Sequence, residues 1–267
     1  MVKMKIYSLS PFFNEYDILD LKVAEEIDEV DKIFLIESNQ SLNCGPKPLN
    51  LRGNKHESNP KVEFCFIKDE FSPKAWTAND TIQKNAVLRF FDYEDDDVLI
   101  CADLDEINNK KDIPRIVASA TEHGFVKLRM FCYYYKINLC RGDKKGWRCS
   151  FAITGKELRK REENIYGLRA KLKGEAIIST DGKHFSYLSN PEGIAYKINN
   201  AGHPEYMSDK YTDEKNIEER IKKHQDPFDR IVPQTGEIQT LTKVLVDKTY
   251  PQTILDNIDF WSKYIAW

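Results

Sequence analysis

Residues 98–107 read Val-Leu-Ile-Cys-Ala-Asp-Leu-Asp-Glu-Ile, five apolar residues that run directly into three carboxylates. The apolar run predicts a buried strand, and the Asp-x-Asp-Glu pattern follows where that strand leaves its sheet. Ligands of open α/β sheets bind at the carboxyl ends of the strands. Carboxylates this close repel unless a positive charge separates them, so the pattern indicates a hard divalent cation with a phosphate-bearing substrate. The alternative is a helix N-terminus, with Asp105 as cap and Glu106 in the first turn.

The rest of the first half alternates between strand and helix patterns, which predicts βαβ units and a mostly parallel sheet flanked by helices. A helix capped by Asp17 has an apolar stripe of Ile18, Leu21, Val23 and Ile27. The other expected strands span 5–9, 32–37, 61–67, 125–135, 147–151 and 184–188, and the other expected helices span 77–91, 112–123, 191–200 and 213–224. Residues 38–60 are rich in Asn, Pro, Gly and Ser, which predicts a long loop near the active site. The tail from 233 to 267 has only a weak pattern of helix or strand.

Bulk properties exclude several classes of protein. The chain has 267 residues, a net charge of −3 and 41% hydrophobic residues, which allows a substantial core and disfavours a nucleic-acid binder. No apolar run is long enough for a transmembrane segment, and the first ten residues lack the apolar core of a signal peptide. None of the six cysteines forms a Cys-x-x-Cys pair. We therefore expect reduced thiols and a cytoplasmic location.

Polar residues follow other predicted strands and helices. Asn14 and Glu15 follow the first strand, where nucleotides bind in such folds, although helix capping explains Asn14 equally well. Glu37 and Asn39 end the second strand, and an acid there accepts hydrogen bonds from a ribose or base, unless this is an ordinary strand end. Further along the chain, Gln83 and Asn85 flank the buried stripe of a helix and are either base-reading amides or solvated side chains.

Two enzyme classes carry Asp-x-Asp after a strand. Nucleotide-sugar glycosyltransferases are one, and haloacid-dehalogenase-like phosphatases, in which the first Asp is the nucleophile, are the other. The phosphatase pattern has Thr or Val at the fifth position and usually ends the first strand of its domain. Here Ile107 supplies no hydroxyl, and about a hundred residues precede the motif, so the transferase is favoured.

Several short motifs then occur in a fixed order along the chain. They are Phe12-Phe13-Asn14-Glu15, Val30-Asp31-Lys32, Ile36-Glu37-Ser38-Asn39, Lys47-Pro48-Leu49, Asp96-Asp97 leading to Asp103-Leu104-Asp105-Glu106-Ile107, His184-Phe185-Ser186-Tyr187 and His203-x-Glu205-Tyr206. Together they resemble glycosyltransferase family 17 over about residues 5–230. The resemblance implies a GT-A-like α/β fold and an inverting transfer of a sugar from a nucleotide-sugar donor, UDP-GlcNAc in the characterised member.

The resemblance also implies an organisation and a set of roles. We expect a single domain over 1–267, with a nucleotide-sugar-binding half (1–125), an acceptor-side half (126–230) and a C-terminal tail (231–267). Mn²⁺ or Mg²⁺ would be held by Asp105, Asp103 and His184. The donor would contact Phe12, Asn14, Glu15, Glu37, Asn39, Gln83, Asn85 and Asp103.

For the reaction itself, Glu205 is expected as the catalytic base together with Asp103 as a catalytic residue, and Asp181 and Glu192 are rivals for the base. The acceptor would be a glycan or a lipid-linked saccharide, in a soluble enzyme of bacterial or viral type. Two alternatives stay open: a Mg²⁺-dependent phosphatase-like hydrolase, and a non-catalytic protein that binds sugar nucleotides or carbohydrates.

Overall fold

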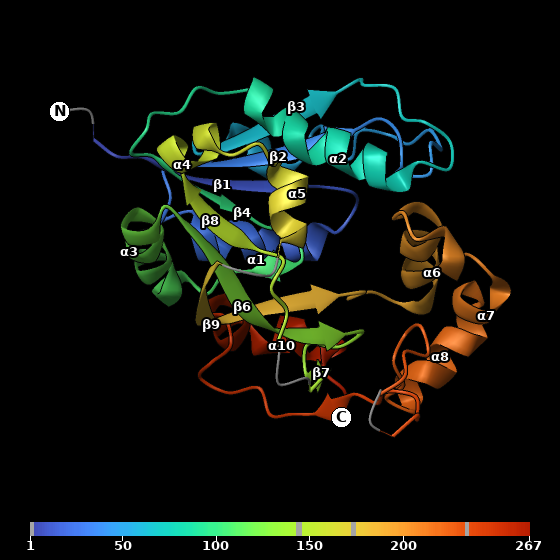
Figure 1. The fold of residues 1–267 in the computed structure, drawn as a ribbon. Coiled ribbons are helices and arrows are strands. Elements are labelled where there is room, and N and C mark those ends of the chain that lie inside the picture. The colour runs from blue at the N-terminus through green and yellow to red at the C-terminus, as the bar shows by residue number, and fades with distance from the viewer. Residues whose placement is uncertain (1–2, 143–145, 172–174, 233–234) are drawn as a thin grey trace.

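The computed structural model describes residues 3–142, 146–171, 175–232 and 235–267. One ten-stranded sheet runs through this part of the chain in the order β10-β7-β6-β8-β4-β1-β2-β3, with β9 beside β6 and β5 beside β9 (Figure 1). The strands are β1 (Ile6–Pro11), β2 (Lys32–Ser38), β3 (Val62–Ile67), β4 (Val98–Cys101), β5 (Glu106–Ile107), β6 (Phe125–Tyr134), β7 (Leu139–Cys140), β8 (Phe151–Thr154), β9 (Ala176–Ser186) and β10 (Thr242–Lys243).

The predicted parallel sheet is confirmed for the first half of the chain. Strands β3, β2, β1 and β4 are parallel neighbours, as βαβ connections require. Beyond β4 the sheet is mixed, because β8 pairs antiparallel with both β4 and β6, whereas β9 lies parallel to β6. The α/β fold class predicted from the sequence therefore holds.

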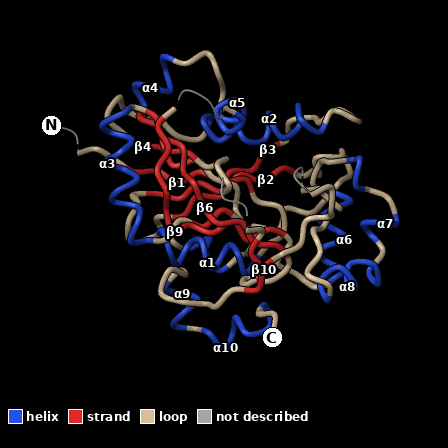
Figure 2. Tube along the Cα trace, turned by 60° about the horizontal axis from the view of Figure 1, so that its bottom comes forward, coloured by secondary structure: helices blue, strands red, loops and turns tan. Residues whose placement is uncertain are grey.

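Helices cover both faces of the sheet. Figure 2 shows α2 and α5 on one side of the strands and α1, α9 and α10 on the other. The helices are α1 (Tyr16–Glu26), α2 (Trp76–Ala86), α3 (Ile113–His123), α4 (Gly155–Lys160), α5 (Ile165–Ala170), α6 (Pro191–Asn200), α7 (Asp209–Thr212), α8 (Glu214–Lys222), α9 (Gln252–Asp256) and α10 (Ile258–Trp261).

Strand β4 is buried on both faces, which explains its uninterrupted apolar sequence. Leu99 and Cys101 pack in the core beneath α2, α4 and α5. Val98 and Ile100 point to the opposite face and pack against α3. A strand held from both sides fixes the position of the acidic residues that follow it.

Several expected boundaries are wrong for local reasons. Asp17 does not cap the first helix but lies in its first turn, which begins at Tyr16. The helix expected over 77–91 ends at Ala86 and continues as a 3₁₀ turn over Val87–Arg89. The strand expected over 147–151 is displaced, since Trp147 makes only an isolated bridge to Met130 and β8 begins at Phe151. The strand expected over 184–188 is the end of β9.

The C-terminal tail is structured despite its weak sequence pattern. Its residues Tyr250, Ile254 and Trp261 are buried in the core beside α1. Residues 233 and 234 of the predicted tail lie outside the described residues. The tail therefore completes one face of the sheet.

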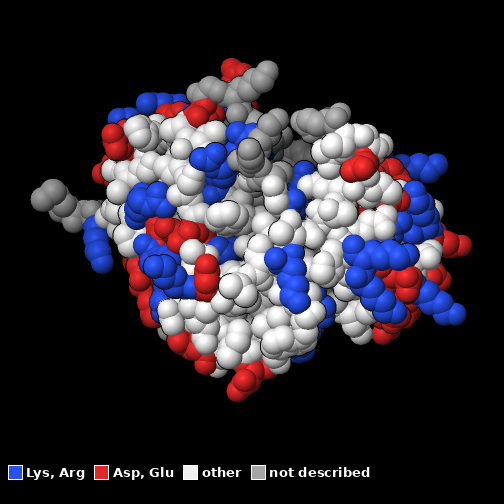
Figure 3. Space-filling model, turned by 90° about the horizontal axis from the view of Figure 1, so that it is seen from below, with Lys and Arg blue, Asp and Glu red and all other residues white. Residues whose placement is uncertain are grey.

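The surface agrees with the near-neutral charge. On the face drawn in Figure 3, positive and negative side chains lie interspersed over much of the surface. None of the helices in the described part of the chain has the length and hydropathy of a membrane-spanning segment. The cytoplasmic location stays a prediction.

Candidate active site

The acidic residues lie at the carboxyl end of the parallel strands, as the sequence predicted. The register between β1 and β4 pairs Leu9 with Cys101, so the turn after β1 lies beside the acids after β4. A cavity of about 340 Å³ opens at this edge. Its wall includes Phe12, Glu15, Lys84, Asp103, Asp105, Trp147, His184, Tyr187, Lys197 and Tyr206. The cavity therefore lies between residues of the first half of the chain and residues of the second half.

Asp103 is held by two cations. Its Oδ1 lies 3.2 Å from the Nζ of Lys84 on α2, and its Oδ2 accepts a hydrogen bond of 2.5 Å from Nη2 of Arg169 on α5. Lys84 is itself paired with Asp80, one turn earlier on α2. The carboxylate of Asp103 is thus neutralised by the protein from two sides.

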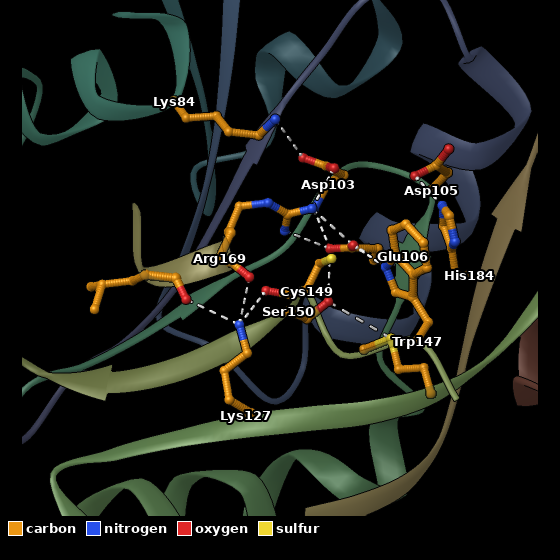
Figure 4. Close-up of polar contacts among 12 residues, drawn as sticks. Lys84, Asp103, Asp105, Glu106, Lys127, Trp147, Cys149, Ser150, Arg169 and His184 are labelled. Atoms are coloured by element: carbon orange, nitrogen blue, oxygen red, sulfur yellow. Dashed lines mark hydrogen bonds and ion pairs between the residues drawn. The ribbon is translucent and has the colours of Figure 1, made fainter. Parts of the chain in front are cut away.

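Glu106 is the buried hub beneath the site (Figure 4). Its carboxylate accepts hydrogen bonds from Nε1 of Trp147 at 2.5 Å and from Oγ of Ser150 at 2.7 Å. Glu106 also accepts hydrogen bonds from the guanidinium of Arg169 and from the backbone N–H of Asp103. Burial would raise the pKa of Glu106, but the charge and hydrogen bonds of Arg169, together with the charge of His184 and the hydrogen bond from Trp147, outweigh burial and hold the pKa well below its usual value. Glu106 is therefore a fixed anion that orders the loop carrying Asp103.

Asp105 faces a different pair of groups. Its Oδ1 lies 3.3 Å from Nε2 of His184 on β9, and its Oδ2 lies 2.9 Å from Nζ of Lys197 on α6. Burial would raise the pKa of Asp105, but these two positive neighbours outweigh it and keep the pKa far below normal. Burial would lower the pKa of His184, but Asp105 and Cys132 together raise it well above its ordinary value. The carboxylate of Asp105 is therefore ionised and paired with positive groups on both oxygens.

A divalent cation fits these donors when the substrate completes its coordination. Within the described residues, no group of three or more His, Cys, Asp or Glu side chains is arranged to hold a metal alone. However, Asp105 supplies an oxygen donor on the cavity wall, and His184 would supply a nitrogen donor beside it once a bound cation displaces the imidazole proton that faces Asp105. Mg²⁺ and Mn²⁺ are commonly held by one or two protein ligands, water and substrate phosphates. The geometry thus suits a cation that arrives with a phosphate-bearing ligand.

Aromatic side chains line the part of the cavity that the second half of the chain contributes. Trp147 stacks on His184 with ring centroids 4.2 Å apart, and Tyr206 stacks on Phe228 at 3.9 Å. Tyr187 also lines this wall. Flat aromatic faces suit the apolar faces of sugar rings.

The sequence profile of glycosyltransferase family 17 matches residues 2–256. This chain belongs to glycosyltransferase family 17. The human β-1,4-mannosyl-glycoprotein 4-β-N-acetylglucosaminyltransferase is 26% identical in an alignment 220 residues long, gaps included, that covers 69% of this chain and 41% of the human protein. The rat protein of the same name is also 26% identical, over 69% of this chain and 40% of its own length. The chain thus spans about two fifths of the length of the curated relatives it matches.

Solved structures resemble the chain at lower similarity. Residues 1–349 of Staphylococcus aureus TarS superpose with a TM-score of 0.44 and 14% identity, covering 82% of this chain and 72% of that chain. Glucosyl-3-phosphoglycerate synthase from Mycobacterium tuberculosis, crystallised with Mn²⁺, UDP and phosphoglyceric acid, gives a TM-score of 0.40 and 12% identity, with coverages of 94% and 91%.

In this family 17 chain, about half of the residues predicted for the donor lie on the cavity. Phe12, Glu15, Gln83 and Asp103 line it, and Nε2 of Gln83 donates to the carbonyl of Ile36 at 3.2 Å. Asn14 lines a neighbouring pocket of about 220 Å³, which shares Glu15 with the main cavity. The turn after β1 thus lies at the cavity, and its contact with a donor stays a prediction.

Glu37 requires a correction. It is completely buried, and its carboxylate accepts from the backbone N–H groups of Asn50 and Leu51 at 2.7 and 2.9 Å. It also pairs with Lys47, whose side chain lines the cavity. Glu37 therefore anchors the long loop after β2 and positions Lys47, rather than contacting a ligand itself.

Two more predicted donor residues lie off the cavity. Neither Asn39, which is exposed, nor Asn85, which is partly buried, is among the described residues that line it. The prediction that the 38–60 loop borders the site nevertheless holds, since Gln40, Ser41 and Leu42 are part of the wall.

Two of the three predicted metal ligands, Asp105 and His184, lie together, whereas Asp103 is paired with Lys84 and Arg169 instead. The candidate bases do not lie on the cavity wall. His184, 79 residues from Asp105 in the sequence, lies beside it as described above. Glu205 is 52% exposed and pairs with His203 at 2.9 Å, next to cavity-lining Tyr206 rather than on the wall itself. Its rival Asp181 pairs with Lys111, and Glu192 is exposed on α6.

The sequence reasoning missed the basic residues of the site. Lys84, Arg169 and Lys197 come from three helices and lie within 3.2 Å of Asp103 or Asp105. No local motif marks them, because single basic residues on helices are usually solvated. The only signal in the sequence was the clustering of Asp103, Asp105 and Glu106, because three neighbouring carboxylates need positive side chains from elsewhere in the chain.

Proposed function

We propose that the chain transfers a sugar, preferably N-acetylglucosamine, from a UDP-sugar to a hydroxyl of a glycan or lipid-linked saccharide. The proposed reaction inverts the anomeric centre and requires Mn²⁺ or Mg²⁺. The observation that carries the proposal is the approach of Asp105 to His184 at 3.3 Å on a cavity wall in a family 17 chain. The curated relatives named N-acetylglucosaminyltransferases support the choice of sugar.

The nucleotide half of the donor is assigned to the ends of β1 and β2. The partly exposed ring of Phe13, next to the buried Phe12, offers an apolar surface there, and the Gln83 amide bridges toward both strands from α2. Glu15 and Lys47 supply charged groups on the same wall. An aromatic surface flanked by amide and charged groups matches the needs of a base and a ribose.

The donor diphosphate is assigned to the acids after β4. Asp105 and His184 would hold the cation, and the bound cation would supply positive charge that stabilises the departing diphosphate. Lys84 and Arg169 fix Asp103 and keep the local charge balanced. Glu106 orders this loop from below, so that Asp105 stays in place as the donor enters.

The acceptor is assigned to the aromatic wall formed by Tyr187, Tyr206 and Trp147. Glu205 is our proposed base, since it follows His203 and precedes Tyr206 at the rim where an acceptor would enter. A carboxylate at this point would take the hydroxyl proton as the oxygen attacks the sugar.

The phosphatase alternative is disfavoured by the surroundings of Asp103. A nucleophilic aspartate needs a carboxylate oxygen free to attack phosphorus, whereas both oxygens of Asp103 lie on cations, Lys84 and Arg169. Hydrolysis of simple phosphate esters with Mg²⁺ would restore that alternative.

A thermal-shift screen of nucleotide sugars, each with and without Mn²⁺, tests the proposal. A ligand at about 100 times its Kd adds roughly 2.7 kcal/mol of stability. We expect UDP-GlcNAc to raise the melting temperature selectively and only with Mn²⁺. Stabilisation without donor hydrolysis or transfer would instead indicate a binding protein, and a flat screen would contradict the proposed function.

A further inference from the structure

Lys197 lies between two carboxylates on the wall of the cavity. Its Nζ lies 2.9 Å from Oε1 of Glu15 and 2.9 Å from Oδ2 of Asp105. The ammonium also lies over the ring of Tyr187, 5.4 Å from its centroid. The ammonium of Lys197 therefore pairs with Asp105, the same carboxylate that the proposed function assigns to a metal ion.

The helix that carries Lys197 is separate from the elements that carry the acids. Helix α6 belongs to a group with α7 and α8 at one edge of the molecule, whereas Glu15 precedes α1 and Asp105 follows β4 (Figure 1). Lys197 lies in the last turn of α6 and reaches across to both acids. It can leave Asp105 by turning its long side chain, without any change in the sheet.

A divalent cation and this ammonium cannot share Asp105 without repulsion. His184 lies by one carboxylate oxygen and Lys197 by the other, so a cation bound to Asp105 would meet a like charge a few ångströms away. A diphosphate supplies new negative charge, and lysine is an effective point-charge partner for phosphate. The ion pair with Glu15 still anchors the Lys197 ammonium when it moves away from Asp105.

We infer that Lys197 is the exchangeable cation of the site, which holds Asp105 before the donor binds and passes to the donor diphosphate when a divalent cation takes Asp105. This inference rests on the proposed function. It makes metal binding weak in the free protein and strong with the nucleotide, because the diphosphate removes the competing ammonium. Coupling of this kind is reciprocal between the two ligands.

The test measures Mn²⁺ binding directly, from the electron paramagnetic resonance signal of free Mn²⁺, with and without UDP. In the wild-type chain, UDP should tighten Mn²⁺ binding by about 10-fold or more. In Lys197→Met, Mn²⁺ alone should bind about 10-fold more tightly than to the wild type, and the gain from UDP should shrink several-fold. Lys197→Arg keeps the charge and should retain weak binding of Mn²⁺ alone.

Two controls separate this role from a structural one. Lys222→Met removes an exposed lysine of α8 and should leave both affinities unchanged. Lys197→Gln keeps hydrogen bonding to the acids without the charge, and it gives the same test if Lys197→Met does not fold. A folded Lys197→Met or Lys197→Gln chain with unchanged or weaker Mn²⁺ affinity would overturn the inference. A wild-type chain without Mn²⁺-dependent UDP binding would instead contradict the proposed function.

Discussion

Arg169 donates hydrogen bonds to Glu106 from both terminal nitrogens, with Nη1 at 2.8 Å from Oε2 and Nη2 at 2.9 Å from Oε1. Such two-point pairs combine strength with a fixed orientation. Because this pair is buried under the acidic loop, it links the stability of the fold to the position of the site. An arginine from α5 thus holds in place the loop that follows β4.

We expect Glu106→Gln to destabilise the protein by about 3 kcal/mol, since it removes one of the two carboxylates that balance the buried Arg169 charge and leaves only Asp103. Urea unfolding followed by circular dichroism would measure the loss. The exposed Glu218→Gln on α8 is the matched control and should change stability by no more than about 0.5 kcal/mol. Equal stability of the two variants would mean that Glu106 is not a structural hub.

The buried Lys127 gives a pH-dependent prediction. Its Nζ donates to the carbonyls of Leu168 and Arg169, and burial lowers its pKa to about 8. Between about pH 8 and the unfolded pKa near 10.4, the unfolded chain holds the proton and the folded chain does not, so stability rises with pH. Relative to Lys127→Met, the wild type should gain roughly 1–3 kcal/mol over this range in urea unfolding. A difference that is flat or falls with pH would contradict this account.

The proposed base is testable once turnover is established. Glu205→Gln should lower kcat by about 100-fold and leave the affinity for UDP with Mn²⁺ unchanged, because the proton acceptor acts on the acceptor hydroxyl only. Asp181 is another candidate base from the sequence, but its carboxylate pairs with Lys111, so Asp181→Asn should leave kcat nearly unchanged. An unaltered kcat in Glu205→Gln would move the role to another carboxylate, first of all Glu15 on the cavity wall.

The sequence predicted the parts of the molecule in which local pattern and tertiary structure agree. The apolar run before Asp103 is a strand buried on both faces, and the acids follow at the edge of the sheet where the cavity opens. The turn after β1 also lies on the cavity. These outcomes follow from topology, because parallel strands bring their carboxyl ends together.

Other features depend on contacts that no local pattern encodes. Glu37 resembled a ligand-binding strand end but anchors a loop, because that loop returns its backbone N–H groups to the carboxylate. The tail was weakly patterned because its helices are short and bury single residues such as Ile254. The cations on Asp103 and Asp105 come from distant helices, so only the fold brings them together.

The most direct measurement of the central claim is UDP binding by calorimetry, with and without Mn²⁺, in the wild type and in Asp105→Asn. Glu218→Gln serves as the control, and thermal melting checks that each variant is folded. We predict that Mn²⁺ strengthens UDP binding to the wild type and the control but not to Asp105→Asn. UDP affinity that responds to Mn²⁺ equally in all three proteins would contradict the assignment of Asp105 to the donor diphosphate.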